Sequence, residues 1–296
     1  MSLGTFVQLI IQGINMGLIY ALAALAVSLI WNASGLFNFS QGDLLTLGGY
    51  FMLTFTVVAL KLPYWVGFAL AIVVMGTMGF FLSRSYFYPM INQKLNPQLI
   101  SIGTVALSVV IRNAILNIWG PSAQRFDNPF GSKPILIGDA IIMPYQIVNI
   151  VIVIILVVLL QLFLRKTVMG IAMRAVAQKP VVSSLMGIKV EQLVSYTFLL
   201  STCLASIAGV LTGPILPLIP EMGSLLSIKA FAAVLIGGLG SFSGALVGGL
   251  IVGISEVLFS TFITSTYKDV FIFLMMMIIL QIRPGGIFRI EISEKV

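Results

Sequence analysis

Long apolar runs separated by short polar segments occupy the chain almost from its start to residue 282. Each run is close to the roughly 20 residues that a helix needs to cross a bilayer, and none alternates with the period of two of a membrane β-strand. The pattern predicts an all-α polytopic membrane protein with about eight to nine membrane-embedded helices. The predicted spans are Phe6–Trp31, Ser40–Leu60, Tyr64–Ser83, Gln98–Trp119, Ala140–Leu164, Gln192–Leu216, a glycine-broken region Ile228–Phe262, and Asp269–Ile282.

The region Ile228–Phe262 is too long for one straight span, and the sequence GGLGSFSGALVGG interrupts it. A helix, a break between Gly237 and Gly244, and a second helix would account for both features. We expect this re-entrant pair to have both of its ends on the outer side. The last span then returns the tail, with Arg283, to the cytoplasm.

Composition supports the membrane assignment and limits the function. Of 296 residues, 59% are hydrophobic and 8% are charged, against about 25% charged in a soluble domain. The chain therefore lacks the residues for a polar shell, and we expect one transmembrane domain over residues 1–296. The N-terminus lacks the basic segment of a signal peptide, so we expect the first span to be retained.

The distribution of charge predicts the orientation. Residues 165–191 form a polar loop with five basic residues and one acid, and the loop containing Arg84 and Lys94 has no acid. The positive-inside rule places both loops in the cytoplasm. The balanced loop of residues 120–139, and with it the N-terminus, should then lie outside. The net charge of +7 resides in such loops, with no basic face for nucleic acid.

One polar stretch, GLFNFSQGDLLTLGGYF, lies inside this apolar sequence. Ser40 and Asp43 have the spacing of a capping box, which favours a helix that begins near the interface with Asp43 as a structural residue. Alternatively, this helix begins inside the membrane and lines a polar path. The glycine-broken region has a similar composition. The candidate path residues are Asn38, Ser40, Gln41, Asp43, Ser241 and Ser243.

Other charges within the apolar runs are isolated in sequence. We expect Arg112 and Glu256 to extend toward an interface, and Lys229 to mark a headgroup boundary. None of them predicts an ion-coupling relay, which argues against a proton- or sodium-driven carrier.

Motifs for chemistry are absent from the sequence. There is no histidine, only one cysteine, no phosphate-binding loop of the GxxxxGK[ST] type and no GxSxG motif. We therefore expect no catalytic residue, no metal site and no cofactor bound by this chain.

Four stretches resemble the branched-chain amino acid permeases of ABC importers, in the order and spacing of that family. They cover most of the chain, which is most similar to the shorter, almost all-membrane permease of the pair. The stretches are GINMGLIYALAALAVSLIW, GLFNFSQGDLLTLGGYF, GIAMRAVAQKPVVSSLMGI and SIKAFAAVLIGGLGSFSGALVGGLIVGISEVL.

The third stretch resembles the loop through which such permeases contact their ATPases. The residues that match the family pattern are Gly170, Arg174, Ala175, Gly187 and Ile188. The chain departs from the pattern at Ile171, Ser183 and Lys179, where arginine, alanine and an acid are common. We expect a short helix bracketed by Gly170 and Gly187, with a bend near Gln178 to Pro180.

The resemblance implies an importer in the plasma (inner) membrane of a prokaryote. Its partners would be a homologous permease or a second copy of this chain, two cytoplasmic subunits that bind ATP, and a periplasmic or lipid-anchored binding protein. The expected substrates are leucine, isoleucine and valine. Urea, short amides or other small amino acids are the alternative within the family, and a stand-alone secondary carrier or channel is the alternative from another class.

Overall fold

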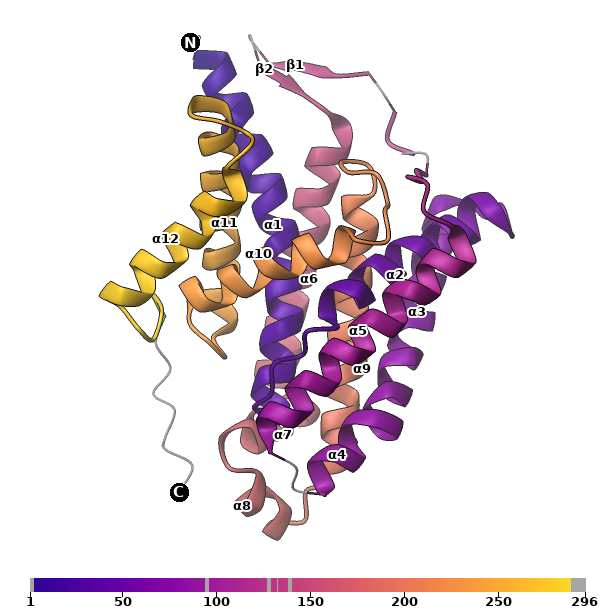
Figure 1. Ribbon diagram of the computed structural model, residues 1–296, viewed down its shortest axis with the longest axis vertical. Coiled ribbons are helices and arrows are strands. Elements are labelled where there is room, and N and C mark those ends of the chain that lie inside the picture. Colours follow the sequence, from indigo (N-terminus) through magenta and orange to yellow (C-terminus); the bar gives the residue numbers. More distant parts are fainter. Residues whose placement is uncertain (1–2, 94–95, 127–128, 132, 138–139, 289–296) are drawn as a thin grey trace.

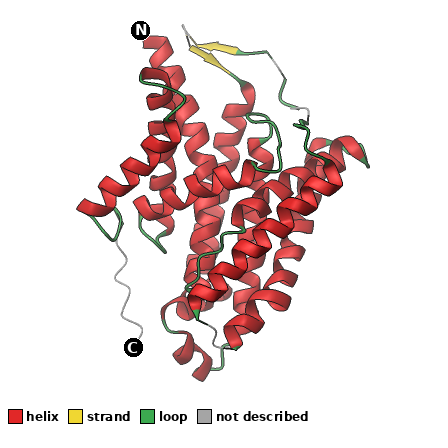
Figure 2. Cartoon of the chain, in the orientation of Figure 1, coloured by secondary structure: helices red, strands yellow, loops and turns green. Residues whose placement is uncertain are grey.

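The computed structural model describes residues 3–93, 96–126, 129–131, 133–137 and 140–288. This part of the chain is almost entirely helical (Figure 2). The helices are α1 (Leu3–Ser34), α2 (Gln41–Leu53), α3 (Tyr64–Leu82), α4 (Tyr88–Asn92), α5 (Pro97–Trp119), α6 (Pro144–Lys166), α7 (Val168–Gln178), α8 (Pro180–Leu185), α9 (Val190–Thr212), α10 (Met222–Gly237), α11 (Phe242–Phe262) and α12 (Lys268–Ile282). π-Helical turns Thr54–Val58 and Ser83–Phe87 extend α2 and α3, and strands β1 (Ile135–Ile137) and β2 (Ala140–Ile142) form an antiparallel hairpin.

Six of the described helices are long and apolar enough to cross a membrane, and shorter apolar helices accompany them. The predicted all-α polytopic fold is confirmed. Two predicted boundaries differ by four residues: the sixth span ends at Thr212 and not at Leu216, and the fifth, expected from Ala140, begins at Pro144. Ala140–Ile142 instead pairs with β1. Proline is favoured in the first turn of a helix, and Met143 before it is extended, which separates the strand from the helix.

Helices α1 and α9 form the core of the molecule. α1 is buried over 89% of its most apolar stretch and α9 over 78%, against 17% for α6 and 28% for α5. α1 packs along α11 through glycines, and a Cβ on Gly253 would lie 2.2 Å from the Cα of Gly17. Such small residues let the two backbones approach closely, as is usual for helices packed in a membrane. The outer helices therefore present apolar surface to lipid or to another subunit.

The two ends of the molecule agree with the orientation predicted from charge. Figure 1 shows the N-terminus and the hairpin β1–β2 at one end, with α4, α7 and α8 at the other. The hairpin end contains the loop that was expected outside, and the opposite end contains the two basic loops that were expected in the cytoplasm. We call these the outer and inner ends.

The predicted break in the glycine-rich region is confirmed. α10 ends at Gly237 and α11 begins at Phe242, with Gly238 and Gly240 at φ angles of 110° and 81° between them. The Asn32 amide near the end of α1 donates to the carbonyl of Gly240 at 2.9 Å, so the break lies toward the inner end. α11 then runs antiparallel to α1 toward the outer end (Figure 1). The first helix differs from the expectation, because it starts at Met222 and packs there against α2 instead of starting at the outer surface.

This topology predicts a pattern of cysteine labelling. In a Cys203→Ser background, a cysteine at Ser265, in the exposed turn between α11 and α12, should react with a membrane-impermeant maleimide added outside intact cells. A cysteine at Ser184, exposed on α8, should react only after the inner face is opened. Labelling of both positions from the same side would contradict the topology.

Candidate functional site

Two short helices meet inside the molecule at their first turns. α10 has 16 residues, or about 24 Å, short of the roughly 30 Å of a bilayer core, and α2 has 13 before its π-helical extension. A Cβ on Gly42 would lie 2.0 Å from the carbonyl oxygen of Gly223, and one on Gly223 would lie 2.2 Å from that of Gly42. Only glycine fits at this crossing, which brings the starts of both helices together beside α5.

Asp43, in the first turn of α2, is 1% exposed and accepts a hydrogen bond from the hydroxyl of Ser108 on α5. Its Oδ1 also lies 3.3 Å from Nε of Arg112, one turn further along α5. The Nη2 group of Arg112 donates to the Ser224 hydroxyl at the start of α10. The structure therefore contains a charge pair, inside the predicted spans, that links α2, α5 and α10.

This arrangement corrects two expectations. The capping box is wrong, since the Ser40 side chain makes no cap and its hydroxyl donates instead to Oδ1 of Asn38 at 2.7 Å. The Asp43 carboxylate is turned toward Ser108 on α5, so it does not accept the hydrogen bond from the backbone N–H of Ser40 that a capping box requires. Arg112 does not extend to an interface, because it is held by Asp43 and Ser224. A paired charge is far less costly inside a membrane protein than an isolated one.

The other polar residues of this stretch fix the segment that leads into α2. The Asn38 amide donates to Oε1 of Gln41 at 3.3 Å, and the Gln41 amide donates to the Ser201 hydroxyl on α9 at 3.1 Å. The backbone N–H of Phe39 donates to the Thr104 hydroxyl on α5 at 3.0 Å. Asn38, Ser40 and Gln41 are all buried. They are anchored between α5 and α9, next to the Asp43–Arg112 pair.

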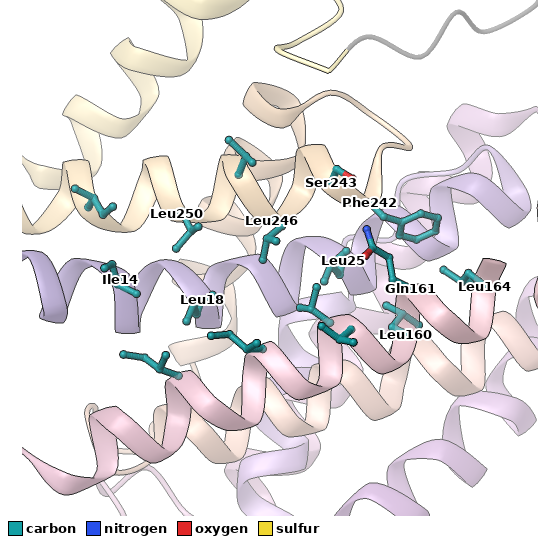
Figure 3. A pocket seen from close by; sticks show the side chains of 16 residues that line it. Ile14, Leu18, Leu25, Leu160, Gln161, Leu164, Phe242, Ser243, Leu246 and Leu250 are labelled. Carbon is teal, nitrogen blue, oxygen red and sulfur yellow. The ribbon is translucent and has the colours of Figure 1, made fainter. Parts of the chain in front are cut away.

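Ser241 and Ser243 lie elsewhere. Ser241 caps α11 by accepting from the backbone N–H of Gly244 at 3.0 Å. Ser243 lines a groove of about 550 Å³ between α1, α6 and α11 (Figure 3). Apart from Ser243 and Gln161 the lining residues are apolar, so the groove suits hydrocarbon and not a charged ligand. The candidate path residues thus form two separate groups.

A second set of charges, two of them buried, lies between α10, α11 and α12. Lys229 Nζ is 2.6 Å from Glu256 Oε1 and 3.2 Å from Asp269 Oδ1, and Lys268 is 3.3 Å from Glu256. The Tyr20 hydroxyl on α1 also donates to Glu256, at 2.7 Å. The expectations for Lys229 and Glu256 were therefore wrong. Two cations and two anions neutralise one another here, and neither buried residue needs to reach an interface.

The polar loop of residues 165–191 forms two helices at the inner end. Thr167 caps α7 by accepting from the backbone N–H of Gly170 at 3.0 Å. α7 ends at Gln178, and Pro180 starts α8, so the predicted bend is confirmed. Gly187, with φ at 84°, ends α8 as expected. Gly170 does not flank the helix but lies in its first turn, where a Cβ would come within 2.3 Å of the Phe163 carbonyl on α6.

One face of α7 and α8 is apolar and exposed. α7 buries Gly170, Met173 and Val176 against the rest of the molecule, while Arg174 faces outward, Ala175 is half-buried, and Ile188 lies just beyond α8. Exposed apolar side chains gathered on two neighbouring helices are typical of an interaction site. We call this exposed set the inner apolar face; it consists of Val168, Ile171, Val181, Val182, Leu185 and Met186.

Comparisons with known proteins agree with this architecture. A family model described as "Branched-chain amino acid transport system / permease component" matches residues 9–280. The high-affinity branched-chain amino acid transport system permease protein LivH of Escherichia coli K12 is 31% identical, over 98% of both chains. BraD, a permease protein of the same description from Pseudomonas aeruginosa, is 29% identical over 98% of both chains. A probable LivH of Methanocaldococcus jannaschii is 31% identical over 91% of this chain and 88% of that protein.

No solved structure matches the chain significantly. The family match covers most of the sequence, and the relatives align from end to end. The multi-pass helical fold is what a transport subunit requires. The chain belongs to the family of permease components of branched-chain amino acid ABC transport systems.

Proposed function

We propose that this chain is a membrane-spanning subunit of an ATP-driven importer in the plasma (inner) membrane of a prokaryote, and that it translocates leucine, isoleucine and valine. An external binding protein delivers the substrate. A homologous permease or a second copy completes the path, and two cytoplasmic subunits bind and hydrolyse ATP. This chain supplies no catalytic residue and binds no cofactor. The observation that carries the proposal is the inner apolar face, which offers a docking surface at the end opposite to the N-terminus.

The packing supports a route by which ATPase closure could reach the polar cluster. α7 contacts α6, α1 and α9. A displacement of α7 and α8 would therefore also displace the core helices α1 and α9. α9 in turn packs on α2 and holds Gln41 through Ser201. In the proposed cycle, the ATPases push on α7 and α8, and α9 carries the displacement to the start of α2. The residues expected to take part in ATPase contact are Gly170, Arg174, Ala175, Gly187 and Ile188.

Docking at the inner apolar face predicts the effect of a charge placed there. Leu185 is 83% exposed, so Leu185→Asp should leave the amount of protein in the membrane unchanged. It should sharply reduce copurification of the ATPase subunits, because a charge must be desolvated in the apolar contact. Ala175→Glu should uncouple hydrolysis from uptake. The matched control is Leu136→Asp on β1, 70% exposed at the outer end, which should copurify the ATPase normally.

Copurification measured by gel filtration, together with ATP-dependent uptake of labelled leucine in proteoliposomes, checks this prediction. Normal uptake and normal substrate-stimulated hydrolysis in both Leu185→Asp and Ala175→Glu would remove the docking assignment.

A further inference from the structure

Arg112 has hydrogen-bonding capacity that its structural partners do not use. Nε bonds Asp43 and Nη2 bonds Ser224, and Nη1 donates no hydrogen bond within the part of the chain that the structure describes. The Arg112 side chain is 34% exposed, whereas that of Asp43 is 2% exposed. The Asp43 carboxylate is therefore hydrogen-bonded within the protein. Part of the Arg112 guanidinium remains exposed, and we call this part its open side. Arginine donates to carboxylates through its guanidinium N–H groups, and those of Nη1 remain available here.

A residue with a carboxylate, Glu221, lies one turn from the serine that Arg112 contacts. Glu221 directly precedes α10, and its carbonyl accepts from the backbone N–H of Ser224 at 3.1 Å, so the two residues are separated by one turn. Residues three apart at a helix start are neighbours on the surface. Glu221 is exposed and forms no ion pair with any residue that the structure describes. Arg112 on α5 thus contacts the first turn of α10, and Glu221 is the residue directly before that turn.

Aliphatic side chains border the charged groups. Val109, one turn before Arg112 on α5, is 51% exposed, and Leu116, one turn after it, is 38% exposed. Ile228, one turn after Ser224 on α10, is 40% exposed. This apolar surface, beside groups of both charges, matches an amino acid with a branched hydrocarbon side chain.

We propose that Arg112 and Glu221 form a weak binding site for a zwitterionic aliphatic amino acid within the permease, which extends the proposed function to particular residues. The substrate carboxylate binds the open side of Arg112 and the ammonium binds Glu221. The hydrocarbon lies against Val109 and Ile228. Asp43 and Ser108 are positioning residues, since they hold the guanidinium from behind. Because Arg112 already shares its charge with Asp43, its hold on the substrate stays weak enough for release.

Two kinds of variant separate a binding role from a structural one. Glu221→Gln changes only an exposed side chain. The double variant Asp43→Asn/Arg112→Gln removes both charges of the pair, so neither is left buried and uncompensated. If the pair served only structure, the double variant would import leucine as well as the wild type does. We expect both variants to copurify with the ATPase subunits and to import leucine at least about tenfold more slowly, because each loses a charged hydrogen bond to the substrate. Arg283→Gln, at an exposed arginine after α12 that forms no ion pair with any described residue, should import normally.

Direct binding gives a second readout. Saturation-transfer NMR on the purified complex without binding protein, with detergent alone subtracted, can compare leucine with 4-methylpentanoate, which lacks the ammonium group. Glu221→Gln should weaken leucine binding and leave 4-methylpentanoate binding unweakened. The double variant should weaken both. A structural defect would not discriminate between the two ligands.

Each outcome decides the proposal. Leucine uptake equal to wild type in Glu221→Gln or in the double variant overturns it, as does equal weakening of both ligands in Glu221→Gln. If the double variant fails to assemble, Arg112→Lys replaces it, because lysine keeps the positive charge beside Asp43 but lacks the guanidinium N–H groups. Normal leucine uptake by Arg112→Lys would overturn the proposal that Arg112 binds the substrate carboxylate. Failure of the wild-type complex to import any branched-chain amino acid would instead refute the proposed function.

Discussion

Gly42→Ala is expected to prevent stable folding of the chain, although it adds a single methyl group. The new Cβ would lie 1.9 Å from the Ser227 hydroxyl oxygen and 2.0 Å from the carbonyl oxygen of Gly223. The second atom belongs to the backbone, so relief requires α2 and α10 to separate. Overpacking of this kind costs about 3 kcal/mol or more where no side chain can yield. The amount of monodisperse protein and its melting temperature in detergent measure the effect.

Gly49→Ala, on the same helix, is the matched control. Its Cβ would meet the end of the Leu218 side chain at 2.9 Å, with backbone atoms no nearer than 3.4 Å. That side chain can rotate away, so we expect a small change in melting temperature. Equal behaviour of Gly42→Ala and Gly49→Ala would show that the close crossing of α2 and α10 is not present in the protein.

Lys229→Met is expected to cause the second large loss. It removes the cation that lies 2.6 Å from Glu256 and 3.2 Å from Asp269. Removing one partner of a buried ion pair typically costs about 3–5 kcal/mol, because the remaining charge is left without compensation. The double variant Lys229→Met/Glu256→Gln should recover much of the stability, since both buried charges are then absent. Thermal unfolding in detergent measures both variants.

Lys268→Met provides the comparison within the same cluster. Lys268 is 40% exposed and lies 3.3 Å from Glu256, so water can replace part of its contribution and the loss should be smaller. If the double variant were less stable than Lys229→Met alone, the two residues would not act as a compensating pair.

The sequence was sufficient for the helices because their signals are local. A run of about 20 apolar residues is visible without knowledge of its neighbours. Pro180 alone predicts the bend between α7 and α8, and the glycines after Gly237 predict the break before α11. The hairpin was missed because Ala140–Ile142 is apolar and continuous with the following span in composition.

The charged residues were predicted poorly because their partners are remote in sequence. Arg112 is paired with Asp43, which is 69 residues away, and Lys229 with Glu256, which is 27 away. Considered alone, each looks like a residue that should extend to an interface. The local capping pattern at Ser40 was misleading for the same reason, since tertiary partners on α5 take the carboxylate. The functional roles of the candidate site residues stay predictions.

ATP-dependent import of leucine is the measurement that separates an ATP-driven importer from a stand-alone carrier or channel. The complex of this chain, its partner permease and the ATPase subunits would be reconstituted in proteoliposomes, with loaded binding protein outside and ATP inside. Labelled leucine should accumulate only when both ATP and the binding protein are present, and omission of this chain should abolish uptake. Leucine uptake by this chain alone, without ATP or a binding protein, would contradict the proposed function and indicate a stand-alone carrier or channel.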